Sequence, residues 1–438
     1  MALETASLKL LADALRTLDA GFAELPPFVP EFPGNAHMAG VLAEAAERLH
    51  DNFPYFHPLY AGQMLKPPHP VARAAYALAT WINPNNHALD GGRASSAMEK
   101  EAVAQIAAMF GLPTHLGHLT GGGTMANLEA LWVAGQLYPG KKILASAQSH
   151  YTHERISGVL KLPFSKVATD DHGRMDMVAL EALAAQGDIG CVVATLGTTG
   201  VGAIDPLPEI LSLREGYGFR VHVDSAYGGY FTLAGNLSPH ARAAFDSISQ
   251  ADSIVIDPHK HGLQPYGCGC VLFRDPAAGA LYRHDSPYTY FSSNDLHLGE
   301  ISLECSRAGA SAVALWSTQR LLPLVEGGEF AAGLEASRRA ALEMARRLEA
   351  DPRFVVPFPP ELDIVVWAPR EGSEMSQRIF DEAARLGLHL ALIRLPVTFF
   401  AGRLQSDSEY ILCLRSVLMK PEHETWVDAI FERLNQTP

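Results

Sequence analysis

The sequence predicts an α/β protein with a mostly parallel sheet, followed by a smaller α+β unit. Helix-like and strand-like segments alternate from about residue 98, which favours a parallel sheet with helices on both faces. After about residue 320, a long amphipathic segment precedes two strand candidates and a closing helix. We therefore expect an N-terminal helix and extended arm in residues 1–85, a large domain in 86–320 and a small C-terminal domain in 321–438.

Composition limits the kinds of partner. The 438 residues are 48% hydrophobic, which is enough for two domains with substantial cores. A net charge of -14 argues against a nucleic-acid partner and against a basic membrane-facing patch. No apolar run approaches the length of a membrane span. A small-molecule partner is therefore expected.

The cysteines and the N-terminus indicate the compartment. The five cysteines are scattered and contain no CxxC pair, so neither a disulfide framework nor a zinc site is expected. The first residues, MALETASLKLLADAL, read as an amphipathic helix and lack the charged, apolar and cleavable regions of a signal peptide. The cysteine pattern and the N-terminal residues therefore predict a cytoplasmic protein with reduced thiols.

The expected elements follow from local patterns. The stretch DNFPYFHPLYAGQMLKPPHP is rich in proline and aromatic residues, which indicates an extended arm. EKEAVAQIAAMF and MANLEALWVAG repeat apolar residues on one helical face. The expected strands of the large domain are KILASA, CVVATLGT, FRVHVDSA, SIVID and CVLF. The small domain is expected to contain the helix FAAGLEASRRAALEMARRLEA, the strands DIVVWA and YILCLRSV, and the helix ETWVDAIFERL.

Lys260 follows a short, continuous apolar strand in the stretch SIVIDPHKHG. Asp257 and Pro258 end that strand, so the lysine lies at a strand's carboxyl end, where parallel sheets bind their ligands. A buried ammonium without a partner is costly. Lys260 therefore has either a special task or a route by which its head reaches solvent.

Two further segments bring polar groups to strand ends. HLTGGGTMANLEAL leads through Gly122, Gly123 and Thr124 into a helix, whose N-terminal N–H groups can bind a phosphate. The alternative is a glycine-rich turn with a capping threonine. FRVHVDSAYGG ends a buried strand with Asp224, which needs a cationic or hydrogen-bonding partner. A structural ion pair is the alternative there.

A fourth segment, ASAQSHYTHERISG, brings His150 just past another strand. A histidine can stack on an aromatic ring, although it can also simply cap the following helix. A metal site at His150 and His153 lacks a nearby third ligand, so no metal is expected. An amine, a carboxylate, a phosphate cradle and a stacking ring are together what an enzyme needs to hold pyridoxal phosphate.

These motifs together resemble the group II pyridoxal-phosphate-dependent amino-acid decarboxylases. HVDSAYGG is similar to that family's aspartate strand, and DPHK to its lysine motif. ATLGTTGVGAIDPLPEI is similar to the segment before the aspartate, and ASAQSHYTHERISG to the stacking-histidine segment. The resemblance implies the type I aminotransferase-like fold, an L-amino acid as substrate, and a homodimer with active sites at the subunit interface.

The resemblance also implies residue roles. Lys260 would bind the cofactor covalently, and Asp224 would pair with the pyridine nitrogen. His150 would stack on one face of the ring, with Ala226 on the other. The remaining residues would hold the phosphate or lie near the cofactor: Gly122, Gly123, Thr124, His259 and Thr198.

Departures from the family pattern leave the substrate open. Asp257 stands where the family often has asparagine, and KHGLQPYGCG and SLECSRAGASAVALW look closer to archaeal tyrosine/aspartate decarboxylases and sphingosine-phosphate lyases. We therefore expect decarboxylation of an aromatic or acidic L-amino acid. The alternatives are an aldol-type carbon–carbon lyase with the same cofactor, and a non-catalytic binding protein that retains the fold.

A proton donor is expected in the stretch RHDSPYTYFSSNDLHLGE, which lacks steady periodicity, as a mobile lid does. In the enzymes that this sequence resembles, a lid tyrosine returns a proton to the α-carbon. Tyr288 and Tyr290 are the candidates here, with His150 or Lys260 as substitutes. The alternative is that these rings anchor the loop to the core.

Overall fold

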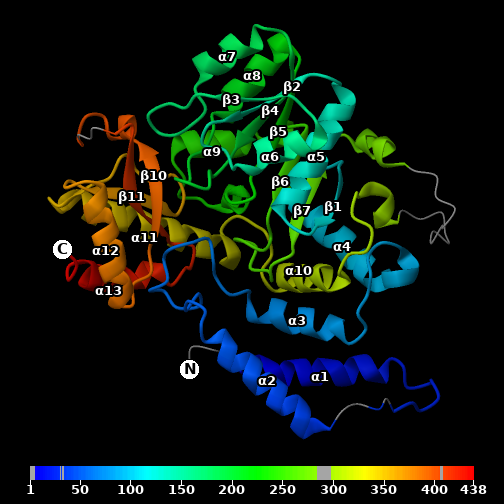
Figure 1. Ribbon diagram of the computed structural model, residues 1–438. Coiled ribbons are helices and arrows are strands. Elements are labelled where there is room, and N and C mark those ends of the chain that lie inside the picture. Colours follow the sequence, from blue (N-terminus) through cyan, green and yellow to red (C-terminus); the bar gives the residue numbers. More distant parts are fainter. Residues whose placement is uncertain (1–4, 30, 32–33, 284–296, 405–407) are drawn as a thin grey trace.

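The protein is described by a computed structural model that covers residues 5–29, 31, 34–283, 297–404 and 408–438. Within these ranges the chain forms a seven-stranded sheet and a four-stranded sheet that lie in two neighbouring bodies (Figure 1). The predicted fold class is confirmed: a large, mostly parallel sheet precedes a small antiparallel C-terminal sheet. The exact domain limits at residues 85 and 320 stay predictions.

The large sheet has the strand order β1-β7-β6-β5-β4-β2-β3. Its strands are parallel except for β7, which runs antiparallel to both of its neighbours. The strands are β1 (Leu116–Thr120), β2 (Lys142–Ser146), β3 (Phe164–Val167), β4 (Ile189–Thr195), β5 (Arg220–Asp224), β6 (Ser253–Ile256) and β7 (Gly269–Phe273). The sequence analysis missed β1 and β3. Both are edge strands and only partly buried, so neither has the continuous apolar run of the inner strands.

Helices cover both faces of this sheet, and successive side chains of a strand pack on opposite faces. In β2, Ile143 and Ala145 pack in one apolar cluster, whereas Leu144 packs in another. One face is covered by α5 (Gly123–Leu137) and α6 (Thr152–Leu160). The opposite face is covered by α4 (Leu89–Met109), α7 (Met177–Ala184), α8 (Leu207–Tyr217) and α9 (Pro239–Asp246). Outside α4 lie α10 (Gly309–Leu321) and α3 (Pro70–Thr80).

The small domain packs helices on an antiparallel sheet of order β10-β11-β9-β8. Its core surrounds Trp367, which is fully buried. Its strands are β8 (Phe354–Val355), β9 (Ile364–Pro369), β10 (Ala391–Pro396) and β11 (Tyr410–Val417). Its helices are α11 (Glu329–Ala350), α12 (Ser373–Arg385) and α13 (His423–Leu434). Short 3-10 turns occur at η1 (Gly229–Leu233), η2 (Ile248–Gln250), η3 (Pro276–Tyr282), η4 (Leu298–Ile301) and η5 (Val397–Phe400).

The N-terminal segment contains two helices, α1 (Ser7–Ala20) and α2 (Asn35–Leu49), where the sequence analysis expected one helix and then an arm. They lie outside the two bodies, beyond α3 (Figure 1), and neither contains a buried residue. The arm itself is tied to the small domain, because Ala61 N donates to His389 O and His389 N donates to Leu59 O, each at 2.9 Å. Among the described residues, no helix is both long and apolar enough to cross a membrane.

Candidate active site

A cavity of about 630 Å³ lies at the carboxyl ends of the parallel strands. It brings together residues from the glycine-rich turn, the loop after β2, the turn after β5 and the loop after β6. Most of the predicted site residues line it: Gly122, Gly123, Thr124, His150, Asp224, Ala226, His259 and Lys260. Segments that are up to 138 positions apart (260 minus 122) therefore meet at one edge of the sheet.

The register of the sheet places these groups. Thr195 at the end of β4 pairs with Asp224 at the end of β5, and Asp224 pairs with Val255 of β6. The next turns are also packed backbone to backbone, because a Cβ on Gly228 would lie 2.2 Å from Leu196 O. Only glycine permits this close approach. The ends of three neighbouring strands are thereby fixed relative to one another.

The glycine-rich turn needs its glycines for two different reasons. Gly122, the N-cap of α5, has a φ of 147°, which L side chains rarely adopt. A Cβ on Gly123 would lie 2.7 Å from Asp257 Oδ2. The first N–H groups of a helix have no intrahelical acceptor, and the helix dipole makes this end positive. Glu304 Oε2 accepts from Gly121 N at 2.9 Å and Thr120 Oγ1 from Gly122 N at 3.4 Å, so Gly123 and Thr124 present the N–H groups that can meet an anion.

Asp224 is buried and paired with His153, a contact that the sequence analysis did not assign. His153 Nε2 lies 2.8 Å from Asp224 Oδ2, and Ala226 N donates to Asp224 Oδ1 at 3.1 Å. Burial raises the pKa of Asp224, but the hydrogen bond and charge of His153 outweigh it, helped by Ala226 N–H and Lys260, so that the pKa lies below its ordinary value. Asp224 is therefore held as a carboxylate.

Lys260 lies beside a second buried carboxylate. Its Nζ is 3.1 Å from Asp257 Oδ2, and His259 Nε2 is 3.5 Å from the same oxygen. His259 Nδ1 donates to Cys268 O at 2.8 Å, which orients the ring so that Nε2 faces Asp257. Burial is the main cause that lowers the pKa of His259. Asp257, noted above as a departure from the family, is thus the group that holds the amine of Lys260.

The remaining predicted residues divide into three groups. His150 and Ala226 line the cavity and are partly buried, and burial lowers the pKa of His150. Thr198 does not belong to the cavity wall: it is fully buried, and its Oγ1 accepts from Ala203 N within its own turn. Its neighbours Gly197 and Thr199 do line the cavity, and the expected place of Thr198 near the cofactor stays a prediction. Tyr288 and Tyr290 lie outside the described residues.

Thr195 is a site residue that the sequence analysis missed. It lines the cavity, and its buried Oγ1 has no hydrogen-bond partner among the residues that the structure describes. A buried hydroxyl without a partner is costly. The sequence signal for this residue was its place at the end of the apolar strand CVVAT. In the sheet, Thr195 pairs with Asp224.

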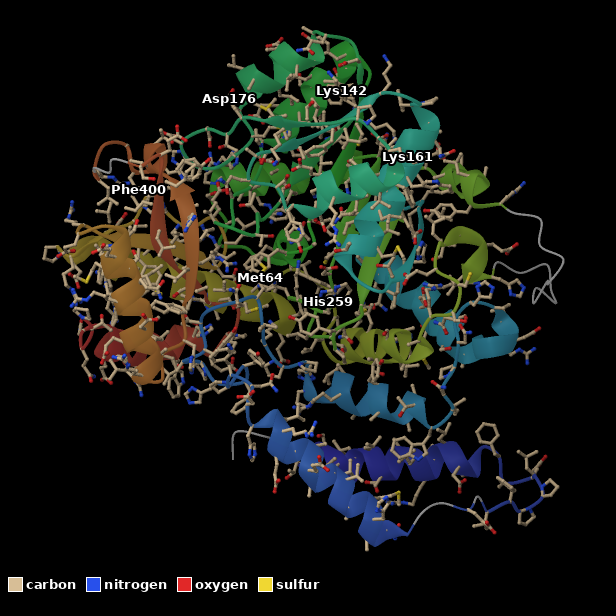
Figure 2. All side chains as sticks on the ribbon, viewed as in Figure 1. Met64, Lys142, Lys161, Asp176, His259 and Phe400 are labelled. Carbon is tan, nitrogen blue, oxygen red and sulfur yellow. The ribbon has the colours of Figure 1, made fainter. Side chains whose placement is uncertain are left out.

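The arm reaches the rim of the cavity. Tyr266 donates its hydroxyl to Met64 O at 3.2 Å, and its ring centroid lies 4.9 Å from that of His259. Figure 2 labels Met64 and His259 in this central region of the molecule. Arg415 of β11 adds a second tie, because it donates to Thr199 O at 2.7 Å and to Gln63 Oε1 at 3.1 Å. Both the arm and the small domain therefore touch the wall of the site.

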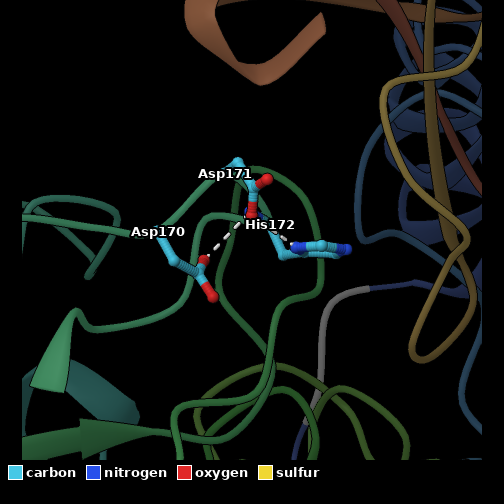
Figure 3. Close-up of side chains that lie close together, drawn as sticks. All are labelled: Asp170, Asp171 and His172. Atoms are coloured by element: carbon cyan, nitrogen blue, oxygen red, sulfur yellow. Dashed lines mark hydrogen bonds and ion pairs between the residues drawn. The ribbon is translucent and has the colours of Figure 1, made fainter. Parts of the chain in front are cut away.

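A group of possible metal ligands lies elsewhere. Within the described ranges, Asp170, Asp171 and His172 bring ligand atoms within 4.8 Å of one another (Figure 3). Asp170 Oδ1 accepts from His172 N, and His172 Nδ1 is 2.7 Å from Asp171 Oδ1. These contacts form an exposed, internally bonded turn, and nothing in it indicates a metal.

The cavity fits pyridoxal phosphate. The N-terminus of α5 suits its phosphate, the ionised Asp224 suits a protonated ring nitrogen, and Lys260 supplies the amine. The unpartnered hydroxyl of Thr195 offers one further polar contact. The fold and this site together define a pyridoxal-phosphate enzyme of the type I aminotransferase-like class.

Comparison with known proteins gives the family. Residues 125–369 match the pyridoxal-dependent decarboxylase conserved domain. The L-tyrosine decarboxylase of Enterococcus faecium is 30% identical over 408 residues, which cover 69% of this chain and 67% of that protein. A probable L-tyrosine/L-aspartate decarboxylase of Methanothermobacter thermautotrophicus is 28% identical over 317 residues, 70% of this chain and 82% of its own. The crystal structure of mouse CSAD matches in fold, with a TM-score of 0.78 at 20% identity, over 96% of this chain and 91% of that one.

The chain belongs to the pyridoxal-dependent decarboxylase family, as the sequence motifs predicted. It is a pyridoxal-phosphate-dependent amino-acid decarboxylase, and the cofactor predicted from the sequence is confirmed. The roles of the individual residues stay predictions.

The pair of His153 and Asp224 yields a test of the site. His153→Leu leaves a buried carboxylate without its partner, which costs about 3 to 5 kcal/mol. We therefore expect the apoenzyme to lose about that much unfolding free energy in a denaturant titration. His172→Leu is the control, because it breaks an exposed histidine–aspartate contact that is worth about 1 kcal/mol or less. Equal losses in the two variants would contradict the importance of the buried pair.

Proposed function

We propose that this chain decarboxylates an aromatic or acidic L-amino acid and that Lys260 is the residue that binds the cofactor. The observation that carries the proposal is the meeting of Lys260, Asp224 and the N-terminus of α5 in one cavity. The names of both relatives compared above include L-tyrosine as a substrate, and the name of the Methanothermobacter protein also includes L-aspartate. These names support the two substrate classes without deciding between them.

The residues of the chain account for the steps around the cofactor. Bound pyridoxal phosphate supplies an electron sink for the bonding pair that remains when carbon dioxide leaves. Asp224 would keep a negative charge beside the ring nitrogen, and His153 would hold that carboxylate in position. Asp257, whose Oδ2 lies 3.1 Å from Lys260 Nζ, would hold this amine in position while it is free of the cofactor. Tyr288 or Tyr290 stays our candidate for returning a proton to the α-carbon.

Arg415 supports an acidic substrate. It is buried, and its guanidinium bonds only uncharged acceptors among the described residues: Gly200 O, Thr199 O and Gln63 Oε1. Burial lowers the pKa of Arg415, although a guanidinium stays charged in proteins. Two of its five N–H groups are not engaged in these contacts. A carboxylate that enters beside Thr199 would meet a buried cation without a carboxylate partner.

The activity is tested by incubating the cofactor-loaded enzyme with each amino acid and measuring carbon dioxide and amine. We expect equimolar carbon dioxide and amine from L-aspartate, L-glutamate or L-tyrosine. Release of an aldehyde without carbon dioxide would show aldol cleavage instead. Absence of any product with all amino acids would favour a binding protein that retains the fold.

Arg415→Met separates the two substrate classes within the same assay. If a side-chain carboxylate meets Arg415, kcat/KM for the acidic substrate should fall about 10- to 100-fold, since hydrogen bonds to charged groups are worth about 1.5 to 3 kcal/mol. Activity on an aromatic substrate should change less. Arg394→Met, at an exposed position of β10, is the control. A loss that is equal for both classes would remove Arg415 as the determinant of substrate class.

Cofactor attachment is tested separately. Borohydride reduction of the yellow, loaded enzyme followed by peptide mapping should find the pyridoxyl group on Lys260, because this amine lies in the cavity beside Asp257. Lys66, which lies in a different cavity, serves as the internal comparison in the same map. A label on any lysine other than Lys260 would refute the assignment.

A homodimer is the second part of the proposal. The two N-terminal helices and the turn after α1 expose large apolar side chains: Leu8, Leu10, Phe22, Met38, Val41, Leu42 and Leu49. Phe53 of the arm is also 56% exposed. Such a surface is typical of an interface with another subunit.

The dimer yields a matched pair of variants. Leu42→Ala removes an apolar contact of α2, so we expect the dimer dissociation constant to rise about tenfold in sedimentation velocity experiments. Glu47→Ala on the polar side of α2 is the control and should leave it unchanged. A chain that is a fully active monomer at every concentration would contradict the proposal.

A reducing, cytoplasmic location is the remaining part. All five cysteines are free, and four of them are buried: Cys191, Cys268, Cys270 and Cys413. Burial raises the pKa of each of these four thiols, which makes them unreactive. This pattern supports a cytoplasmic protein.

A further inference from the structure

A second cavity, of about 370 Å³, lies between the arm, α11 and the segment after β11. It shares no lining residue with the active-site cavity. Its polar wall is formed by Lys66 and His69 of the arm, His261, Ser337 of α11, and Lys420. The family relationship and the proposed chemistry give this cavity no task.

Two lysines meet in this wall. Lys66 Nζ donates to Met419 O at 3.1 Å, and Met419 directly precedes Lys420. Lys420 is 4% exposed, and its Nζ donates to Tyr60 O at 2.7 Å. Each ammonium thus uses one of its three N–H groups on a backbone carbonyl. Lys420 Nζ also lies over the ring of Tyr60, 5.3 Å from its centroid, and neither ammonium forms a further hydrogen bond among the described residues.

Neither lysine is directly paired with a counter-charge in the part of the chain that the structure describes. The buried carboxylate of Asp363 raises the pKa of Lys66 against the effect of burial, but its two oxygens already accept from Tyr227 and His261. Among the described residues, no carboxylate lies within 4 Å of either ammonium, since neither forms a salt bridge there. Glu329 and Glu422 also line the cavity, but both are exposed at its rim, where water screens them. Burial lowers the pKa of Lys66 to about 8 and that of Lys420 to about 7. Lys420 is buried and Lys66 is partly buried, and cations withdrawn from water in this way are stabilised by an opposite charge.

The cavity is connected to the active site through one histidine. His261 follows Lys260 in the chain and lines the second cavity. Its Nε2 lies 2.8 Å from Asp363 Oδ2, and its Nδ1 lies 3.0 Å from Tyr227 O. Tyr227 lines the active-site cavity and donates its hydroxyl to Asp363 Oδ1 at 2.5 Å. A ligand in the second cavity would therefore contact a residue bonded to the wall of the first.

We propose that the second cavity binds a small, doubly charged oxyanion, a dicarboxylate or a phosphate, between the ammonium groups of Lys66 and Lys420. The volume admits a ligand of this size, and the two ammonium groups supply a pair of charged donors. Ser337 offers a hydroxyl on the opposite helix. The ligand is neither the cofactor nor the reacting substrate, so the site is an effector site.

The test uses the cofactor-loaded enzyme, so that the cofactor's own phosphate occupies the active site. Succinate and inorganic phosphate are titrated separately by isothermal calorimetry at pH 7. We expect saturable binding of at least one of them, with a dissociation constant that rises at least tenfold in Lys420→Met. Lys141→Met is the matched control, because Lys141 Nζ also donates to a backbone carbonyl, Gly187 O, but lies outside the cavity.

Lys66→Met provides a second variant in case Lys420→Met does not fold, as judged by cofactor absorbance and thermal unfolding. If only succinate binds, the site is a dicarboxylate site, and if only phosphate binds, it is a phosphate site. In each case, weaker binding of that anion to the lysine variants supports the proposal. Binding that is unchanged in a folded lysine variant would place the ligand elsewhere, and no binding of either anion to the wild type would overturn the proposal. Neither result depends on which amino acid the enzyme decarboxylates.

Discussion

The site depends on one buried charge, the carboxylate of Asp224. A carboxylate at the end of an inner strand is costly unless it is paired, and here His153 and the N–H of Ala226 supply the pairing. This arrangement holds the negative charge in place before any cofactor arrives. His153 is itself fixed by α6, which packs against the sheet through Ile156. The helix that covers the sheet therefore also determines the electrostatics of the site.

Around this charge, backbone packing gives the site its precision. The close contact between Gly228 and Leu196 O joins the turns after β4 and β5, and the contact between Gly123 and Asp257 joins the glycine-rich turn to the loop of Lys260. Both contacts leave no room for a Cβ. Rigid contacts of this kind keep an anion-binding helix end, a carboxylate and an amine at fixed separations, which preorganises a cofactor site.

The small domain and the arm complete the wall. Asp363, at the start of β9, accepts from Tyr227 and His261 of the large domain, and its pKa is lowered by His261 and Tyr227 against the opposing effect of burial. Arg415 of β11 bonds the turn at Thr199 and the arm at Gln63. Buried charges therefore link the two bodies at the site, and a change at the domain interface can reach the cavity that holds Lys260.

The fold class and the family could be predicted from the sequence, and most of the predicted site residues do line the cavity. Inner strands are buried on both faces, so they appear as continuous apolar runs, and the polar residue that ends each run marks the ligand-binding edge. Lys260 and Asp224 were recognisable for that reason. The edge strands β1 and β3 and the helix α2 lacked this signal because they are only partly buried or wholly exposed. The contacts between polar residues came from the three-dimensional structure: His153 with Asp224, Asp257 with Lys260, and Thr195 in the wall of the cavity. Such pairings depend on strand register and helix packing between segments far apart in the chain, and local patterns do not encode them.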